Sequence, residues 1–237
     1  MKFQTLVIGY CLALALFLFA QHRPELNQSG AFHHVEDLTH AIETTSGQSS
    51  VRVVPAVQRD PRTRELNESP ATRIIAPAQA VTGLWSVDQI PAGRLVAPLV
   101  ILDITNQMRN QIDYQISVED IARWEHVNGE IPLGSVVIAR TGWLPTNRST
   151  PRFSQDAALF LVEGRKILGL GSDAPFIDSR SSGISNVYRY ALSHSIYYLE
   201  NVANLDRLPD RGAVVVVAPT KIKGRTAAPA RIMALVQ

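Results

Sequence analysis

Uninterrupted apolar runs alternate with segments of helical periodicity through the middle of the chain. Residues 95–104 are apolar with few breaks, which is typical of a strand buried on both faces of a sheet. Residues 135–141 and 166–170 are shorter runs that we also predict to be strands. Two further apolar runs, 213–219 and 230–236, are predicted to form neighbouring antiparallel strands.

Helix-start signals lie between these predicted strands. Ser117 is a good N-cap, Asp120 can complete a capping box, and Gly129 is expected to end the helix. Ser154 should cap a helix over residues 155–162, and Ser185 one that reaches about residue 192. The inner stripe of the first helix is predicted to consist of Ile121, Trp124 and Val127.

Strands that alternate with helices predict an α/β fold with a mixed sheet and flanking helices. The chain of 237 residues is long enough for one sizeable core. We therefore predict a single compact domain over residues 35–237, preceded by a loose segment over residues 21–34.

The first 20 residues are predicted to be a secretory signal peptide. Lys2 gives a short positive start, residues 6–20 are apolar, and Ala20 is suited to cleavage. The apolar run has 15 residues, whereas a membrane-spanning helix needs about 20. Secretion, without a stable membrane span, is therefore the prediction, and a signal anchor is the alternative.

Amino-acid composition excludes only a few classes of function. The net charge of +2 gives no electrostatic argument for nucleic-acid binding. The single cysteine, Cys11, lies inside the predicted signal, so the mature protein would have neither a disulfide nor a thiol nucleophile. In a eukaryotic secretory pathway, Asn27 and Asn147 are candidate glycosylation sites, while Pro70 makes Asn67 a poor acceptor.

The closing part of the chain carries the most specific pattern. Residues 198–236 read LEN-x-ANLD-x-L, then an apolar strand followed by P-x-KI-x-G, then APAR. The segments DLTH, RTGW and GSDAPFID occur earlier in the chain. Together these segments resemble the cyclase family, which includes kynurenine formamidase (arylformamidase) and isatin hydrolase. The resemblance implies a metal-dependent hydrolase fold, a homodimer, and a metal-binding role for the acid at Glu200.

The family's main metal motif, H-x-G-T-H-x-D-x-P-x-H, is matched here by SPATRIIAPAQ at residues 69–79. The resemblance also implies a second metal-binding histidine 12 residues before the glutamate. Only Glu200 keeps the implied ligand type. The other implied ligand or base positions hold Ser69, Arg73, Ile75, Gln79 and Tyr188.

These replacements argue against a metal ion. Zinc sites use three or four protein ligands, and a permanently charged guanidinium at Arg73 repels a divalent cation. We predict that Arg73 replaces the metal as the counter-charge of Glu200, since a buried carboxylate needs a partner. The alternative is that Arg73 points to solvent and Glu200 accepts from a backbone amide.

Two functional hypotheses follow. One is a secreted pseudoenzyme that needs no cofactor and acts by binding a small molecule or a partner subunit. The other is an active hydrolase of the kynurenine formamidase type, in tryptophan catabolism, which would bind Zn or Mn through Glu200 and displaced histidines. Its candidate ligands are His33, His34, His40 and His194. Taken singly, His40 is predicted to be a hydrogen-bonding core histidine, and His33 and His34 a solvated pair.

Overall fold

The computed structural model describes residues 32–41, 71–111, 114–144, 152–174 and 186–237. Residues His33–Val236 form one compact unit. The predicted signal peptide, both candidate glycosylation sites, Ser69 and Ser185 lie outside the described residues.

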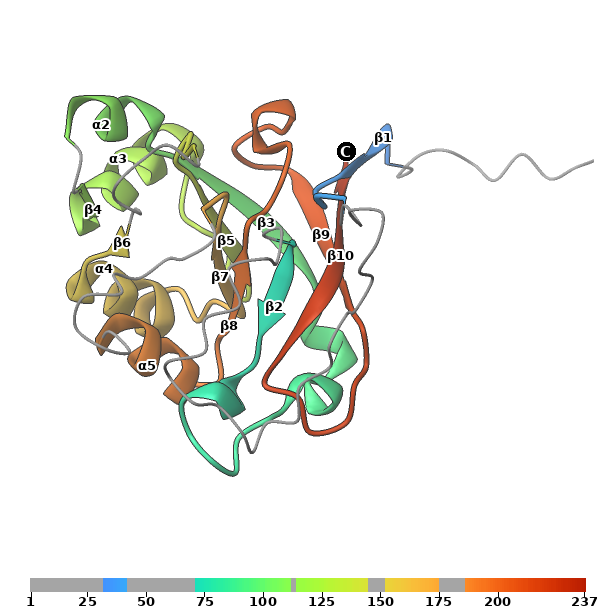
Figure 1. Ribbon diagram of the computed structural model, residues 1–237. Helices are drawn as coiled ribbons and strands as arrows, with labels where there is room; N and C mark the ends of the chain where they lie inside the picture. Colours follow the sequence, from blue (N-terminus) through green and yellow to red (C-terminus); the bar gives the residue numbers. More distant parts are fainter. Residues whose placement is uncertain (1–31, 42–70, 112–113, 145–151, 175–185) are drawn as a thin grey trace, which may run out of the picture. The chain divides into compact units, whose positions relative to one another are not determined.

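Seven strands of the main sheet close into a barrel (Figure 1). In spatial order they run β10-β2-β8-β7-β5-β3-β9, and β9 pairs back with β10, while β1 is added outside on β10. Their bounds are β1 His34–Asp37, β2 Arg73–Ile75, β3 Val96–Asp103, β5 Val136–Arg140, β7 Gly169–Ser172, β8 Tyr197–Glu200, β9 Ala213–Pro219 and β10 Ala227–Val236.

Strands β3, β5, β7 and β8 are mutually parallel, whereas β2, β9 and β10 pair antiparallel. The parallel strands are joined through helices, as parallel pairing requires. These helices gather on one side of the sheet (Figure 1). They are α2 Thr105–Asn110, α3 Val118–Asn128, α4 Gln155–Leu159 and α5 Asn186–Ser193, and a small second sheet pairs β4 Gln115–Ile116 with β6 Arg152–Phe153.

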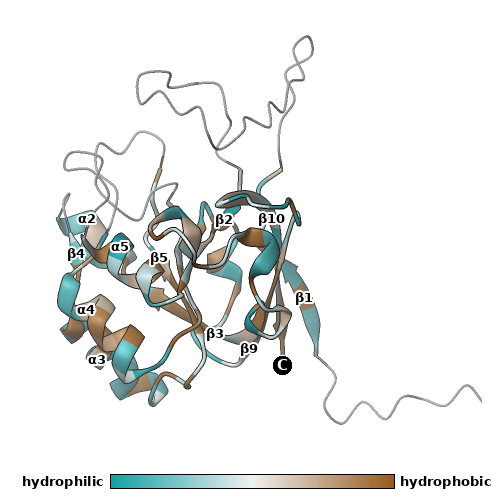
Figure 2. Cartoon of the chain, turned by 90° about the horizontal axis from the view of Figure 1, so that it is seen from below, coloured by the Kyte–Doolittle hydropathy of each residue, from teal (hydrophilic) through white to brown (hydrophobic). Residues whose placement is uncertain are grey.

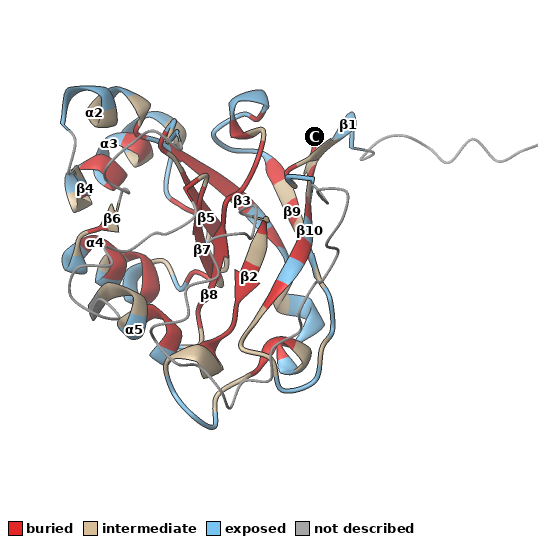
Figure 3. Cartoon of the chain, viewed as in Figure 1, coloured by how far each residue is buried: buried red, intermediate tan, exposed pale blue. Residues whose placement is uncertain are grey.

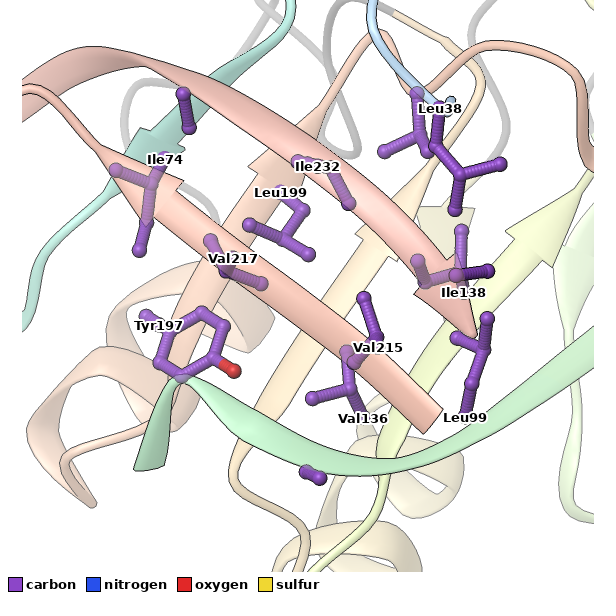
Figure 4. Packing of buried hydrophobic residues seen from close by; sticks show 14 of the residues in the cluster. Leu38, Ile74, Leu99, Val136, Ile138, Tyr197, Leu199, Val215, Val217 and Ile232 are labelled. Carbon is purple, nitrogen blue, oxygen red and sulfur yellow. The ribbon is translucent and has the colours of Figure 1, made fainter. Parts of the chain in front are cut away.

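The barrel separates two hydrophobic cores. Its interior is filled by side chains from six of the seven strands, among them Ile74, Leu99, Val215 and Ile232 (Figure 4), and β7 contributes none. The outer core lies between the barrel and the helices and contains Tyr198. Strands β5, β7 and β8 are buried on both faces (Figure 3), and β1 is largely hydrophilic (Figure 2).

The α/β fold class, the strand at 95–104 and the antiparallel final pair are confirmed. The first helix has the predicted Ser117–Asp120 capping box and ends at Gly129. The prediction for Val127 was wrong, because its side chain is 78% exposed. At 100° per residue, Val127 lies about 120° from Ile121 around the helix, so only Ile121 and Trp124 face the core.

The boundaries of one strand and one helix also differ from those predicted from the sequence. The strand predicted at 166–170 is β7, Gly169–Ser172, because Lys166 adopts a left-handed conformation that ends the preceding turn. The helix after Ser154 changes at Phe160 into a π-helical turn, η4, Phe160–Gly164. Ser154 is the N-cap as predicted.

Candidate functional site

The pairing of β2 with β8 positions the candidate site. Arg73 lies opposite Glu200, and Ile75 lies opposite Tyr198. Because side chains alternate along a strand, all four lie on one face of this strand pair. Ile75 and Tyr198 belong to the outer core, so this face is the one beneath the helices.

Arg73 and Glu200 form a salt bridge. The guanidinium Nε donates to Glu200 Oε2 at 2.7 Å. The Glu200 side chain is 5% exposed, and that of Arg73 is 36% exposed. The cation therefore reaches solvent while the carboxylate stays buried.

Burial raises the pKa of Glu200, and the charge and hydrogen bond of Arg73 oppose that rise. A carboxylate removed from water needs a cation or several hydrogen-bond donors to remain ionised. Arg73 is thus the group that favours the charged form of Glu200 at neutral pH.

Polar contacts hold the backbone on both sides of this salt bridge. Thr72 Oγ1 donates to the Asn201 carbonyl at 2.7 Å, and the His40 backbone N–H donates to Thr72 Oγ1 at 2.9 Å. The chain after β1 is therefore fixed beside β2. Asn201 has a φ of 55°, a left-handed conformation that asparagine tolerates better than most residues.

Two tyrosines of the outer core pack on each other, and one of them, Tyr198, lies on the strand face that carries the salt bridge. Tyr188 lies on α5, and its ring centroid is 4.9 Å from that of Tyr198, with a tilt of 34°. Tyr198 is fully buried, whereas Tyr188 is partly exposed. A ring therefore occupies the position where the family resemblance implies a metal-binding histidine.

Gln79 is engaged elsewhere. It ends the 3-10 helix η1, Pro77–Gln79, and its Oε1 accepts from Thr226 Oγ1. The Thr226 carbonyl in turn accepts from the Ala76 backbone N–H at 2.8 Å. These contacts tie η1 to the segment that enters β10.

A half-buried acid, Asp173, lies where β5 and β7 end. Asp173 accepts hydrogen bonds from the Thr141 backbone and hydroxyl and from the Gly142 backbone, at 2.5–3.1 Å. Burial raises the pKa of Asp173, and these donors oppose the rise. Asp173 thus joins the RTGW and GSDAPFID segments, a contact that was not predicted from the sequence. A lone acid directly after one apolar strand was the available signal.

The histidines proposed as displaced ligands are dispersed. His34 pairs with Val236 at one end of β10, seven residues from Pro229, which pairs with Arg73. That separation is about 23 Å along a strand. His194 lies beyond the other end of β8 from Glu200.

His40 is exposed, which contradicts the prediction of a core histidine. The chain leaves the sheet after Asp37, and the hydrogen bond to Thr72 comes from the His40 backbone, so the ring is not needed inside. His33 and His34 are both exposed, in agreement with a solvated pair.

The described side chains do not fit a divalent metal ion. Within residues 32–41, 71–111, 114–144, 152–174 and 186–237, no group of three or more His, Cys, Asp or Glu side chains is placed to hold one. Glu200 is the acidic side chain at the site, and its Oε2 atom is paired with the Arg73 guanidinium. Metal sites in proteins need more ligands than this.

The Cyclase family model matches residues 36–179. The chain belongs to the cyclase family. It is 30% identical over 192 residues to an isatin hydrolase of Roseibium aggregatum, covering 72% of this chain and 73% of that protein.

Solved structures show the same relationship. Isatin hydrolase A from Labrenzia aggregata, bound to benzyl benzoate, matches with a TM-score of 0.69 and 28% identity, over 86% of this chain and 93% of that one. A structure described as a potential metal-dependent hydrolase with cyclase activity matches with a TM-score of 0.61 and 25% identity, over 85% and 96%. The scaffold is therefore that of cyclase-family hydrolases.

None of the described helices is both long and apolar enough to cross a membrane.

Proposed function

We propose that this cyclase-family protein has lost metal-dependent amide hydrolysis and acts by binding a small molecule or a partner subunit. The observation that carries the proposal is the salt bridge between Arg73 and Glu200. A guanidinium bonded to the retained acid supplies the positive charge that a metal ion would otherwise supply, but it cannot activate a water molecule as a metal does.

The replacements around the salt bridge support this proposal. Ile75 offers no lone pair and is 5% exposed, and Gln79 is bonded to Thr226. Tyr188 offers a ring packed on Tyr198. The family resemblance implies a metal ligand or a proton-transferring group at each of these three positions. Each position instead holds a side chain that packs or forms a hydrogen bond within the protein.

The same groups suggest what the site would bind. A relative is bound to benzyl benzoate, an aromatic ester, and relatives are named for isatin, an aromatic amide. The partly exposed Tyr188 ring, packed on Tyr198, and the partly exposed Arg73 cation are the groups here that suit an aromatic ligand carrying an oxygen acceptor. Secretion after cleavage near Ala20, and a homodimer or partner subunit, remain parts of the proposal.

The test measures metal content and turnover of the purified mature protein. Metal would be quantified by inductively coupled plasma mass spectrometry. Hydrolysis of isatin and of N-formylkynurenine would be followed with added Zn²⁺ or Mn²⁺, beside an active isatin hydrolase as control. We expect neither stoichiometric metal nor turnover, and binding of isatin or kynurenine without hydrolysis.

Stoichiometric metal together with turnover would overturn the proposal and favour the active hydrolase. In that case His40, whose backbone is bonded to Thr72, is the displaced histidine to replace first. His40→Ala would then remove metal and activity, whereas His34→Ala, at the far end of β10, would not.

A further inference from the structure

A cavity lies at the opposite end of β8 from Glu200. Its volume is about 440 Å³, and its polar lining consists of Arg94, Glu163, Lys166 and His194 over an apolar floor. Ile196, which lines it, directly precedes β8, and Glu200 ends β8. The three residue steps of β8 alone separate the two sites by about 10 Å.

Arg94 is a partly buried cation without an acidic partner. In the described part of the chain, neither Arg94 nor Lys166 forms an ion pair with a carboxylate. One Arg94 amino group donates to the Ser195 carbonyl at 2.9 Å, but Nε is buried and has no acceptor. Burial accordingly lowers the pKa of Arg94. A buried donor without an acceptor is costly, and the charge of this guanidinium is not balanced by any carboxylate of the described residues.

The position of Arg94 is fixed from two sides. Its guanidinium carbon lies 5.2 Å from the centroid of the Trp85 ring, and its backbone carbonyl accepts from the Tyr197 hydroxyl at 2.9 Å. Tyr197 is 1% exposed. The cation is therefore held at the cavity rather than free to swing into solvent.

Lys166 reaches the cavity from a strained backbone. Its φ is 48°, in the left-handed region that few residues other than glycine, asparagine and aspartate adopt. Ser195, whose carbonyl binds Arg94, has a φ of 62°. Glycine would be less strained than lysine at position 166.

The single acid of the cavity lining is already engaged. Glu163 Oε1 accepts from the Tyr190 hydroxyl at 2.7 Å. His194 packs its ring on Tyr190, with centroids 4.3 Å apart, and its Nδ1 donates to the Tyr190 carbonyl at 2.8 Å. The cavity lining therefore carries two cationic side chains and one carboxylate. Its net charge is positive even when His194 is neutral.

We propose that this cavity binds a compact oxyanion, the phosphate group of a small ligand, through Arg94 and Lys166. The guanidinium and ammonium groups would donate charge-assisted hydrogen bonds to its oxygens. The apolar floor would contact the rest of the ligand. This site is independent of the Arg73–Glu200 pair and of whether the protein hydrolyses amides.

The test is calorimetric titration of the full mature chain with inorganic phosphate, with acetate titrated in parallel. Lys166→Gly is the decisive variant, because glycine suits the left-handed backbone and should leave the fold at least as stable. We expect it to weaken phosphate binding by about tenfold or more, since it removes a charge-assisted hydrogen bond. Arg94→Gln should weaken binding similarly.

Lys223→Gly is the matched control, because Lys223 is exposed on another loop and its loss changes the net charge equally. Its phosphate affinity should equal that of the parent chain. Absence of saturable phosphate binding would overturn the proposal, and so would equal effects of the Lys166 and Lys223 variants. Acetate binding as tight as phosphate would reassign the ligand to a carboxylate and contradict the phosphate assignment.

Discussion

At the scale of single residues, the salt bridge between Arg73 and Glu200 controls how stability depends on pH. We expect Arg73→Gln to lower the free energy of unfolding by about 2 kcal/mol at pH 7. Removing one partner of a fully buried pair costs about 3–5 kcal/mol, and the 36% exposure of Arg73 reduces that figure. Urea denaturation would measure the loss, with Glu200→Gln as the control that removes the carboxylate charge.

Urea denaturation at acid pH tests whether Arg73 and Glu200 act as a charge pair. The pKa of Glu200 is raised in the folded state, so folded chains bind more protons than unfolded ones between about pH 4.5 and the folded-state pKa. The contribution of Glu200 is most favourable below that value and is lost as pH rises through the folded-state pKa. The penalty of Arg73→Gln should therefore shrink when Glu200 is protonated, and a pH-independent penalty would contradict the pairing model.

At the scale of single elements, close approach between β7 and β8 depends on Gly169. A Cβ placed on this glycine would lie 2.4 Å from a ring carbon of Tyr197, a buried side chain with a fixed hydroxyl. Gly169→Ala should lower the free energy of unfolding by about 1–3 kcal/mol through overpacking. Gly93→Ala, which meets no atom within 4 Å, is the control and should be near neutral in thermal unfolding.

Equal stability of the two alanine variants would mean that Tyr197 can move aside. In that case Arg94 would be less firmly fixed as well, because its carbonyl holds the Tyr197 hydroxyl.

Elements that depend on local signals were the ones predicted from the sequence. The capping box at Ser117 and the apolar strand now assigned as β3 required no knowledge of distant contacts. The exposure of Val127 was missed because a spacing of three residues departs from the helical period over two turns.

The contacts of the candidate site were only partly predictable. The Arg73–Glu200 pairing was inferred from family positions, and the structure places the two side chains 2.7 Å apart. The contacts of Asp173 were missed because its donors lie about 30 residues earlier, directly after β5. Contacts between distant strands leave no periodic signal in either segment.

At the scale of the whole molecule, closure of the barrel depends on β10. This strand pairs with β1, β2 and β9, so its removal leaves three edges open and exposes the interior core. Deleting residues 227–237, which removes all of β10, should abolish the cooperative thermal transition followed by circular dichroism. Deleting only residue 237, which lies beyond β10, should leave that transition in place.

A truncated chain that still melted cooperatively near the parental temperature would show that the remaining strands form a stable open sheet. The order of the strands makes this outcome unexpected, because β2 would then keep only β8 as a neighbour.

The place of β10 in the chain also has a consequence for biosynthesis. Every other strand of the barrel leaves the ribosome before β10 does, so none of the earlier strands can complete the ring as it emerges. The nascent chain must carry apolar surface and unpaired strand edges until synthesis of this last strand is finished. Until β10 has formed, the earlier strands can pair with other chains instead, so aggregation is the competing outcome at that stage.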